Sequence, residues 1–432
     1  MFVTHAFRPR RLLVVLLALL VISVLLLALT GAPATRAQSE EDDYAAPFVT
    51  LLGRAVLPAD TFAPGPPSGA AVRPNNGRTP PFPSQPVQGV SAVIPKWNGN
   101  FLVMADNGFG AKTNSADFRL RWYEMAIDFN SGQVAVVGYT ELSDPNNLVP
   151  WPIVNGATDR VLTGADFDLE SFQQAPDGTF WFGEEFGPYI LHTDAAGRLL
   201  QAPISMPYPA ELEPFARGLP YVQSPEHPQF ADLPDRDSRI AAANLPSSRG
   251  LEGMAINEDG DILYPLMEGA LQDDPIQTRL MIQEFDLETG TFTGNYWYYL
   301  LEDPTYAIGE MTVVEGNNEF LIIERDQGQG AEARFKRIYR VNLNSFDQNR
   351  VLRKQLVVDL MSITDEREIT APEEGAIGLG NFFSFPFITI ESVYPFSDGS
   401  MLVANDNNYP GSNGRRPGVP DDNEFILIKP KN

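Results

Sequence analysis

Residues 164–190 read GADFDLESFQQAPDGTFWFGEEFGPYI, and they decide how the chain folds. Pro176-Asp177-Gly178 is a tight-turn signal, because proline presets one backbone angle and glycine accepts a positive φ. Short apolar runs flank this turn at 172–175 and 179–182, so the segment is expected to form a β-hairpin. A hairpin returns the chain to the edge where it began. Glu170 at its start and Glu184/Glu185 at its end should therefore lie side by side on one rim.

The same spacing recurs along the chain. A polar residue precedes a turn residue by eight positions in five places: Ser91/Gly99, Glu170/Gly178, Glu252/Gly260, Glu310/Asn318 and Glu391/Gly399. Seven residues beyond the turns come Asp106, Glu185, Met267, Arg325 and Asp406. Five hairpins on one template form an internal repeat, which is typical of solenoids, propellers and arrays. The repeat predicts an all-β fold, a β-propeller of five or six four-stranded blades.

The domain layout follows from local composition. Residues 1–37 resemble a signal peptide, with three arginines before an uncharged apolar run at 12–29 and small residues at a cleavage site. The run is nearly long enough to span a bilayer, so it could also remain as an uncleaved anchor. Residues 38–46 are expected to be an acidic disordered leader. Residues 47–432 are expected to be the propeller domain, with a strand at 48–57 that closes the ring, a Pro-rich loop at 58–89 and an insertion at 203–248.

The composition narrows the possible partners and compartments. The chain has 432 residues, a net charge of −25 and no cysteine. Such a negative charge argues against nucleic acid as a partner, since phosphates would be repelled. An exported protein without disulfides fits a periplasmic or extracellular location at a bacterial envelope. We expect a secreted monomer that associates with a membrane only if the N-terminal segment is uncleaved.

Oxygen is the metal-binding atom that this sequence offers. There are three histidines in the whole chain, and neither a G-x-S-x-G motif nor a P-loop is present. Radial blades would bring the repeated acids together at the central channel, where Ca²⁺ takes six to eight oxygen ligands. The predicted ligands are Glu170, Glu252, Glu310, Glu391, Asp106, Asn107 and Asp406, with Asp168 and Asn407 as further donors. The alternative is that these acids bond to backbone amides or arginines and tie the blades together.

Basic residues stand close to these acids in the sequence. Arg119, Arg121, Arg249 and Arg325 carry planar guanidinium groups, which suit phosphate or carboxylate. They either pair with the acids or bind an anionic substrate. A metal together with arginines could neutralise a phosphate ester and activate a water for attack. Glu185 and Asp326 are the candidates for a catalytic base.

Four segments of the chain resemble the bacterial phytase-like family, which is described as having esterase-like activity. They are GVSAVIPKWNGNFLVMADNGFGAKTNSADFRLRWYEMAIDF, DFDLESFQQAPDGTFWFGEEFGPYILHTDAAGRLL, SRGLEGMAINEDGDILYPLMEG, and GEMTVVEG followed by LIIERDQG. The resemblance implies kinship to calcium-dependent propeller phytases and a metal site at the acidic cluster. Those phytases carry several pocket lysines, whereas Lys112 and Lys336 are the lysines near these rims. This difference favours a simpler phosphate ester or a carboxylic ester over phytate.

The sequence thus predicts a secreted, metal-dependent hydrolase of phosphate esters or other small esters, with calcium in the channel. Two other classes of function stay open. A calcium-dependent lactonase or arylesterase would need the metal but not the arginines. A non-enzymatic propeller that binds a partner at the cell surface would keep the metal as a structural plug.

Overall fold

The computed structural model describes residues 48–314 and 318–431, which belong to one unit spanning Ala46–Asn432. The predicted signal peptide at 1–37 and the acidic leader at 38–46 lie outside the described residues. So do residues 315–317, which directly precede Asn318, the turn residue of the Glu310/Asn318 repeat. No helix in the described parts of the chain combines the length and the apolar character that a membrane crossing requires.

The hairpin at 164–190 forms as predicted. β8 (Leu169–Gln174) pairs antiparallel with β9 (Phe180–Glu184), and Leu169 stands opposite Glu184. Gly178 has a φ of +85°, and the amide of Ala175 bonds to the carbonyl of Thr179 at 3.0 Å across the turn. This positive φ is where the turn requires glycine.

Four consecutive segments of the chain form antiparallel four-stranded units of the same order. The first unit is β4 (Ala92–Pro95), β5 (Phe101–Met104), β6 (Arg121–Asp128) and β7 (Gln133–Glu141). The second is β8, β9, β10 (Tyr189–Thr193) and β11 (Ile204–Ser205). The third is β12 (Gly253–Ile256), β13 (Ile262–Leu266), β14 (Arg279–Asp286) and β15 (Thr291–Leu300). The fourth is β16 (Ala307–Val314), β17 (Glu319–Arg325), β18 (Lys336–Phe346) and β19 (Leu352–Asp359).

A further unit joins the two ends of the described chain. β22 (Ile390–Pro395), β23 (Met401–Asn405) and β24 (Asn423–Pro430) are followed in the sheet by β1 (Val49–Leu57). β1 runs antiparallel to β24, from Val49 opposite Pro430 to Leu57 opposite Asn423. The strand predicted at 48–57 therefore forms and pairs with the last strand. One parallel pair, Val56 with Gln133, links β1 of this unit to β7 of the first unit. This pair joins the strands of the two units into one larger sheet.

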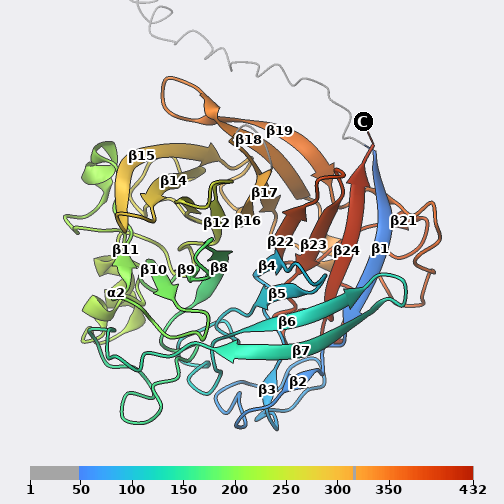
Figure 1. Ribbon diagram of the computed structural model, residues 1–432, viewed down its shortest axis with the longest axis horizontal. Helices are drawn as coiled ribbons and strands as arrows, with labels where there is room; N and C mark the ends of the chain where they lie inside the picture. The colour runs from blue at the N-terminus through green and yellow to red at the C-terminus, as the bar shows by residue number, and fades with distance from the viewer. Residues whose placement is uncertain (1–47, 315–317, 432) are drawn as a thin grey trace, which may run out of the picture. The chain divides into compact units, whose positions relative to one another are not determined.

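The first strands of these units contact one another in a cycle. β4 contacts β8, β8 contacts β12, β12 contacts β16, β16 contacts β22, and β22 contacts β4. Figure 1 shows these strands toward the middle of the ribbon, with the later strands of each unit farther out. The residues at the ends of the first strands are consequently brought close together although they lie hundreds of positions apart in sequence.

The hydrophobic core lies between neighbouring units. Side chains alternate between the two faces of a strand, so Trp181 and Phe182 of β9 enter different clusters. Each fully buried side chain of this size contributes roughly 1.5–3 kcal/mol. The five large clusters each draw residues from two successive units, for example Met104 and Phe182, Trp181 and Leu263, Ile282 and Phe320, Ile323 and Val403, and Val103 and Ala404.

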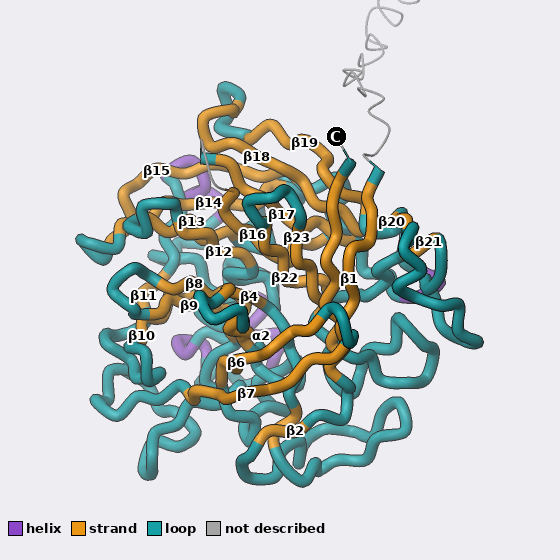
Figure 2. The backbone as a smooth tube through the Cα atoms, turned by 45° about the vertical axis from the view of Figure 1, so that its right-hand side comes forward, coloured by secondary structure: helices purple, strands orange, loops and turns teal. Residues whose placement is uncertain are grey.

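The insertions add short elements to this nearly all-β unit, as Figure 2 shows. The predicted insertion at 203–248 holds β11, the 3₁₀ helices η1 (Ala210–Phe215) and η2 (Pro228–Phe230), and α2 (Arg236–Ala242). The Pro-rich loop contains β2 (Phe62–Ala63), paired with β3 (Gln85–Pro86). β20 (Ile363–Thr364), β21 (Phe382–Phe383) and η3 (Gly330–Glu332) are the remaining short elements that the structure describes. No pattern in the sequence predicted β11, because its two residues pair with β10 from inside the insertion.

Candidate functional site

A cavity of about 730 Å³ lies where the first and second strands of the units meet. Eight carboxylates and three arginines line it. The carboxylates are those of Asp106, Asp168, Glu170, Glu185, Glu252, Glu268, Glu391 and Asp406, and the arginines are Arg73, Arg249 and Arg325. Acidic groups therefore outnumber basic groups in this cavity.

The strand boundaries position these acids. Glu170 and Glu391 are the second residues of β8 and β22, and each is left unpaired by a shift of register with the neighbouring strand. An unpaired residue of this kind is a β-bulge, which re-aims its side chain. Glu252 directly precedes β12, and Glu185 and Asp406 directly follow β9 and β23. The repeat thus delivers its acids to one rim, as the hairpin spacing predicted.

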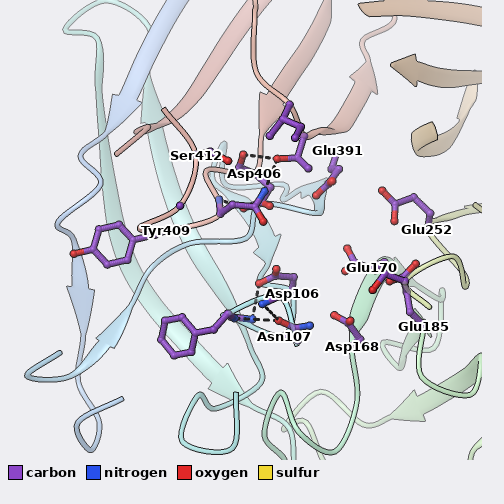
Figure 3. Close-up of a pocket in the computed structure, with 18 of the residues that line it drawn as sticks. Asp106, Asn107, Asp168, Glu170, Glu185, Glu252, Glu391, Asp406, Tyr409 and Ser412 are labelled. Atoms are coloured by element: carbon purple, nitrogen blue, oxygen red, sulfur yellow. Dashed lines mark hydrogen bonds between the residues drawn. The ribbon is translucent and has the colours of Figure 1, made fainter. Parts of the chain in front are cut away.

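Six of the acids form three overlapping groups. One oxygen from each member lies within 4.8 Å of the others in Asp168–Glu170–Glu185, in Glu170–Glu252–Glu391 and in Glu185–Glu252–Glu268. Glu170, Glu185 and Glu252 each belong to two groups. Figure 3 shows their side chains directed toward a shared space, together with Asp106, Asp168, Glu391 and Asp406. Shared carboxylates allow neighbouring groups to act as one centre.

Arg325 contacts more acids of this cluster than any other arginine that lines the cavity. Arg325 is the last residue of β17. Its Nη2 lies 3.1 Å from Glu391 and 3.6 Å from both Glu252 and Glu268. The guanidinium is buried, and within residues 48–314 and 318–431 its Nε has no hydrogen-bond partner. Arg325 is shared among three carboxylates and Arg249 lies 3.5 Å from Glu268, so the six acids of the cluster still outnumber the two cations that contact them.

Two buried oxygens in the cluster have no hydrogen-bond partner among the residues that the structure describes. They are Oδ1 of Asp168 and Oε1 of Glu252. A buried polar atom without a partner is costly, and a hard divalent cation can satisfy it. All the donors that these groups offer are carboxylate oxygens, the ligand type that Ca²⁺ prefers. The residues present therefore fit a calcium ion.

Other acids of the cavity are partly held by the backbone. Asp106 Oδ1 accepts from the amide of Gly108 at 2.8 Å, Asp406 Oδ1 accepts from Asn408 at 2.7 Å, and Glu185 Oε1 accepts from Gly250 at 2.8 Å. These bonds fix one oxygen of each carboxylate and leave the second oxygen for another partner. The sequence left open that these acids bond to backbone amides. For these three acids, this is the case for one oxygen of each carboxylate.

Burial raises the pKa values of the cavity acids. It raises the pKa of Asp168 to about 7, that of Glu391 to about 8 and that of Asp406 to about 6. Burial followed by repulsion from Glu252 holds the pKa of Glu170 well above its usual range, and burial followed by repulsion from Glu268 does the same for Glu252. The cavity therefore resists ionisation unless positive charge enters it.

Several predicted site residues lie elsewhere. Arg119 and Arg121 do not line the cavity, because both bond to Glu141 at the outer edge of the first unit, at 2.9 and 2.5 Å. Asp326 is held by Lys336, whose Nζ lies 2.8 Å away, and is not a lining residue. Asn107 lines the cavity, and its Oδ1 accepts from the amide of Gly110 at 2.7 Å.

Glu310 is also absent from the lining, and the strand register explains why. In the fourth unit Ile308 stands opposite Glu324 and Glu310 opposite Ile323, so the unpaired residue is Gly309. Gly309 therefore takes the place that Glu170 and Glu391 have in their units. The Glu310 carboxylate instead bonds to the amide of Met311 at 2.8 Å and to the backbone of Met254 in the neighbouring unit. The repeat spacing therefore identified the residue that follows the bulge, and not the bulge residue whose side chain would face the cavity.

The bulge at Gly309 has no room for a side chain. A Cβ there would lie 2.0 Å from the carbonyl oxygen of Ile390, on the adjacent first strand β22. We expect Gly309→Ala to destabilise the protein by about 1–3 kcal/mol, since the two backbones would have to separate. Gly138→Ala is the matched control, because a Cβ at that position meets nothing within 4 Å. Equal urea-unfolding midpoints for the two variants would contradict this assignment.

Two charged residues that line the cavity, Glu268 and Arg73, were missing from the predicted site residues. In the third repeat, Met267 occupies the position seven residues beyond the turn, and Glu268 follows it directly. An acid one residue after that position was the sequence feature that could have indicated Glu268. Arg73 belongs to the Pro-rich loop, which has no repeat to show where its side chains go. Asp168, considered as a further donor, lies in the first of the three acidic groups.

Comparisons with solved structures return proteins of low sequence identity. An endo-1,5-alpha-L-arabinanase from Thermotoga petrophila is 13% identical, with a TM-score of 0.39 over 79% of this chain and 71% of that one. Regucalcin from Agrobacterium tumefaciens, described as a calcium-binding protein, is 12% identical, with a TM-score of 0.35 over 80% of this chain and 93% of that one. Similarity at this level says nothing about the substrate of this protein.

Comparisons of sequence give a distant relative and a family. A protein of Arthroderma benhamiae, described as an uncharacterized secreted protein, is 28% identical over 192 residues. The match covers 40% of this chain and 37% of the relative, so it spans well under half of that protein. A family model described as "Phytase-like: Esterase-like activity of phytase" matches residues 85–409, which include every cavity acid. This match extends over well more than half of the chain, and the protein belongs to the phytase-like family.

Proposed function

We propose that this protein is a secreted, calcium-dependent hydrolase of phosphate esters or other small esters, with one or more calcium ions held in the acidic cavity. The observation that carries the proposal is the set of three overlapping carboxylate groups, which share Glu170, Glu185 and Glu252. So many buried acids repel one another, and a hard cation relieves that repulsion. Family membership adds the ester class of substrate.

The chain's own residues have separate tasks in this proposal. Glu170, Glu252, Glu391, Asp168 and Glu268 would hold the cation, and Glu185, which lies among them, is left for catalysis. Arg325 keeps Glu252, Glu268 and Glu391 oriented through its three contacts. A calcium ion in a hydrolase supplies charge neutralisation for the oxygen of the ester and makes water easier to deprotonate. Asp106, Asn107 and Asp406 line the same space and complete the polar wall.

Glu185 is the candidate general base. Its Oε1 is fixed by the amide of Gly250, and burial and the nearby Asp168 hold its pKa well above the usual range. The bond to Gly250 holds this carboxylate at the wall of the cavity, where it could accept a proton from a water. Asp326 has no part in this scheme, because it neutralises Lys336 outside the cavity.

The scaffold in this proposal is a five-bladed propeller. The cycle of contacts among β4, β8, β12, β16 and β22 supports five blades. The pairing of β1 with β24 supports ring closure by the N-terminal strand. The hydrophobic cluster that combines Val103 with Ala404 supports packing of the last blade against the first.

The compartment and partners complete the proposal. The arginines before the apolar run at 12–29 and the secreted relative support export, to the periplasm or the exterior. The net charge of −25 disfavours nucleic acid and leaves a small ester as the partner of a monomeric enzyme.

Calorimetry and a substrate screen test this function. Purified metal-free protein should take up calcium, and the calcium-loaded protein should hydrolyse p-nitrophenyl phosphate or another small ester, with EDTA abolishing turnover. Hydrolysis of lactones and neutral aryl esters alone would indicate a calcium-dependent lactonase or arylesterase. Calcium uptake without turnover of phosphate esters, lactones or aryl esters would indicate a binding protein with a structural metal. Absence of calcium uptake would overturn the proposal.

A further inference from the structure

The acidic cluster already contains a cation that belongs to the chain itself. Nη2 of Arg325 lies 3.1 Å from Oε1 of Glu391 and 3.6 Å from Oε1 of both Glu252 and Glu268. Glu252 and Glu391 belong to one of the three acidic groups, and Glu252 and Glu268 belong to another. One guanidinium therefore contacts two of the three acids in each of these groups.

The guanidinium holds these acids more by charge than by hydrogen bonds. Its contact with Glu391 is a hydrogen bond, whereas the 3.6 Å to Glu252 and Glu268 is longer than an N–H···O bond. Oε1 of Glu252 and Nε of Arg325 have no hydrogen-bond partner in the part of the chain that the structure describes. The arginine thus offsets charge and leaves carboxylate oxygens available to a divalent cation.

The side chain of Arg325 borders open space as well as the acids. It lines the cavity of about 730 Å³. Its backbone is fixed at the end of β17, where Arg325 pairs with Ala307 on one side and Lys336 on the other. A fixed backbone beside an open cavity allows the guanidinium to move away from the acids without disturbing the sheet.

We infer that Arg325 is a built-in counter-cation that competes with calcium for Glu252, Glu268 and Glu391 and thereby sets the calcium affinity of the site. The inference rests on the proposed function and specifies its regulation. In the metal-free protein, Arg325 offsets part of the repulsion among the buried acids. A divalent cation on the same carboxylates is repelled by the guanidinium, so the arginine lowers its affinity. Arg325 thus favours a folded metal-free protein and weakens calcium binding.

Isothermal titration of the metal-free protein with calcium compares the wild type with Arg325→Gln, Arg325→Lys and Arg337→Gln. We expect Arg325→Gln to bind calcium about 10- to 100-fold more tightly, a factor typical of coupling between two binding events. Arg325→Lys keeps the positive charge and should stay closer to the wild type. Arg337 lies on the neighbouring strand β18, pairs with Asp359 and does not line the cavity, so Arg337→Gln should match the wild type. Calcium binding by Arg325→Gln that is equal to or weaker than that of the wild type overturns the inference.

A second measurement covers the case in which metal-free Arg325→Gln unfolds, since three buried acids lose their shared cation. The variant is then prepared with calcium, and a chelating dye follows the release of calcium from the folded protein. Release should be about 10- to 100-fold slower than from the wild type, because the competing charge is gone. Release at the rate of the wild type or faster overturns the inference.

The outcomes separate this inference from the proposed function. Failure of calcium uptake by the wild type overturns the proposed function. Uptake by Arg325→Gln and not by the wild type would still support the inference, because the arginine would then be the cation that excludes calcium. Uptake by neither protein overturns both.

Discussion

Glu252→Gln should lower the calcium affinity of this protein by more than 100-fold and remove most of its hydrolase activity. Glu252 belongs to two of the three acidic groups and carries a buried oxygen without a hydrogen-bond partner. Loss of a residue that merely supports a metal ligand costs about 10- to 100-fold, so loss of a shared ligand should cost more. Isothermal titration with calcium measures the first effect, and turnover at saturating calcium measures the second.

The same variant should have the opposite effect on the metal-free protein. Burial and the charges of Glu268 and Glu391 hold the pKa of Glu252 well above its usual range, so its charged form is disfavoured in the folded state. Glutamine has nearly the same shape and no charge. Metal-free Glu252→Gln should therefore unfold at a higher temperature than the wild type at pH 8. Glu374→Gln, which removes a charge from an exposed residue outside the cavity, is the control. Unchanged calcium affinity in Glu252→Gln would contradict its assignment as a ligand.

The metal-free protein should lose thermal stability as the pH rises from about 5 to 8. An acid whose folded-state pKa is raised binds a proton more tightly when folded, so its contribution to stability is present below the unfolded pKa and is lost as the pH approaches the folded value. For Asp406, Asp168 and Glu391 the folded values are about 6, 7 and 8. The loss should therefore continue across the whole interval. With roughly 2 °C per kcal/mol, we expect Tm to fall by about 5–10 °C.

Calcium should reverse this pH dependence. The cation offsets the negative charge that appears as the acids ionise, so saturating calcium should raise Tm most at pH 8 and least at pH 5. Below pH 4 the trend changes sign, because Arg415 and Arg54 hold the pKa of the buried Glu424 at about 2 and its contribution is lost on protonation. Scanning calorimetry with EDTA and with calcium at each pH measures both curves. A metal-free Tm that is flat or rises between pH 5 and 8 would contradict the effect.

The sequence repeat predicted most of the acids that line the cavity. The spacing from acid to turn is a local property of a hairpin, and it carried Glu170, Glu252, Glu391, Asp106, Glu185 and Asp406 to the cavity. It failed for Glu310, because a bulge moves the register by one residue without changing the length of the hairpin. Nearness to Asp106 in the sequence was also misleading for Arg119 and Arg121. Both guanidinium groups bond to Glu141, the last residue of β7, and do not line the cavity.

By itself the sequence determined the hairpins, their repetition, the strand at 48–57 and the concentration of acids at one rim, because each depends on residues a few positions apart. The tertiary structure alone decided which acids share a cation-sized space, that Arg325 stands among three of them, and that Arg73 faces the same cavity. These relations join segments that touch only after the first strands of all the units have come together. Distances between such segments are set by packing and backbone register, which no local spacing encodes.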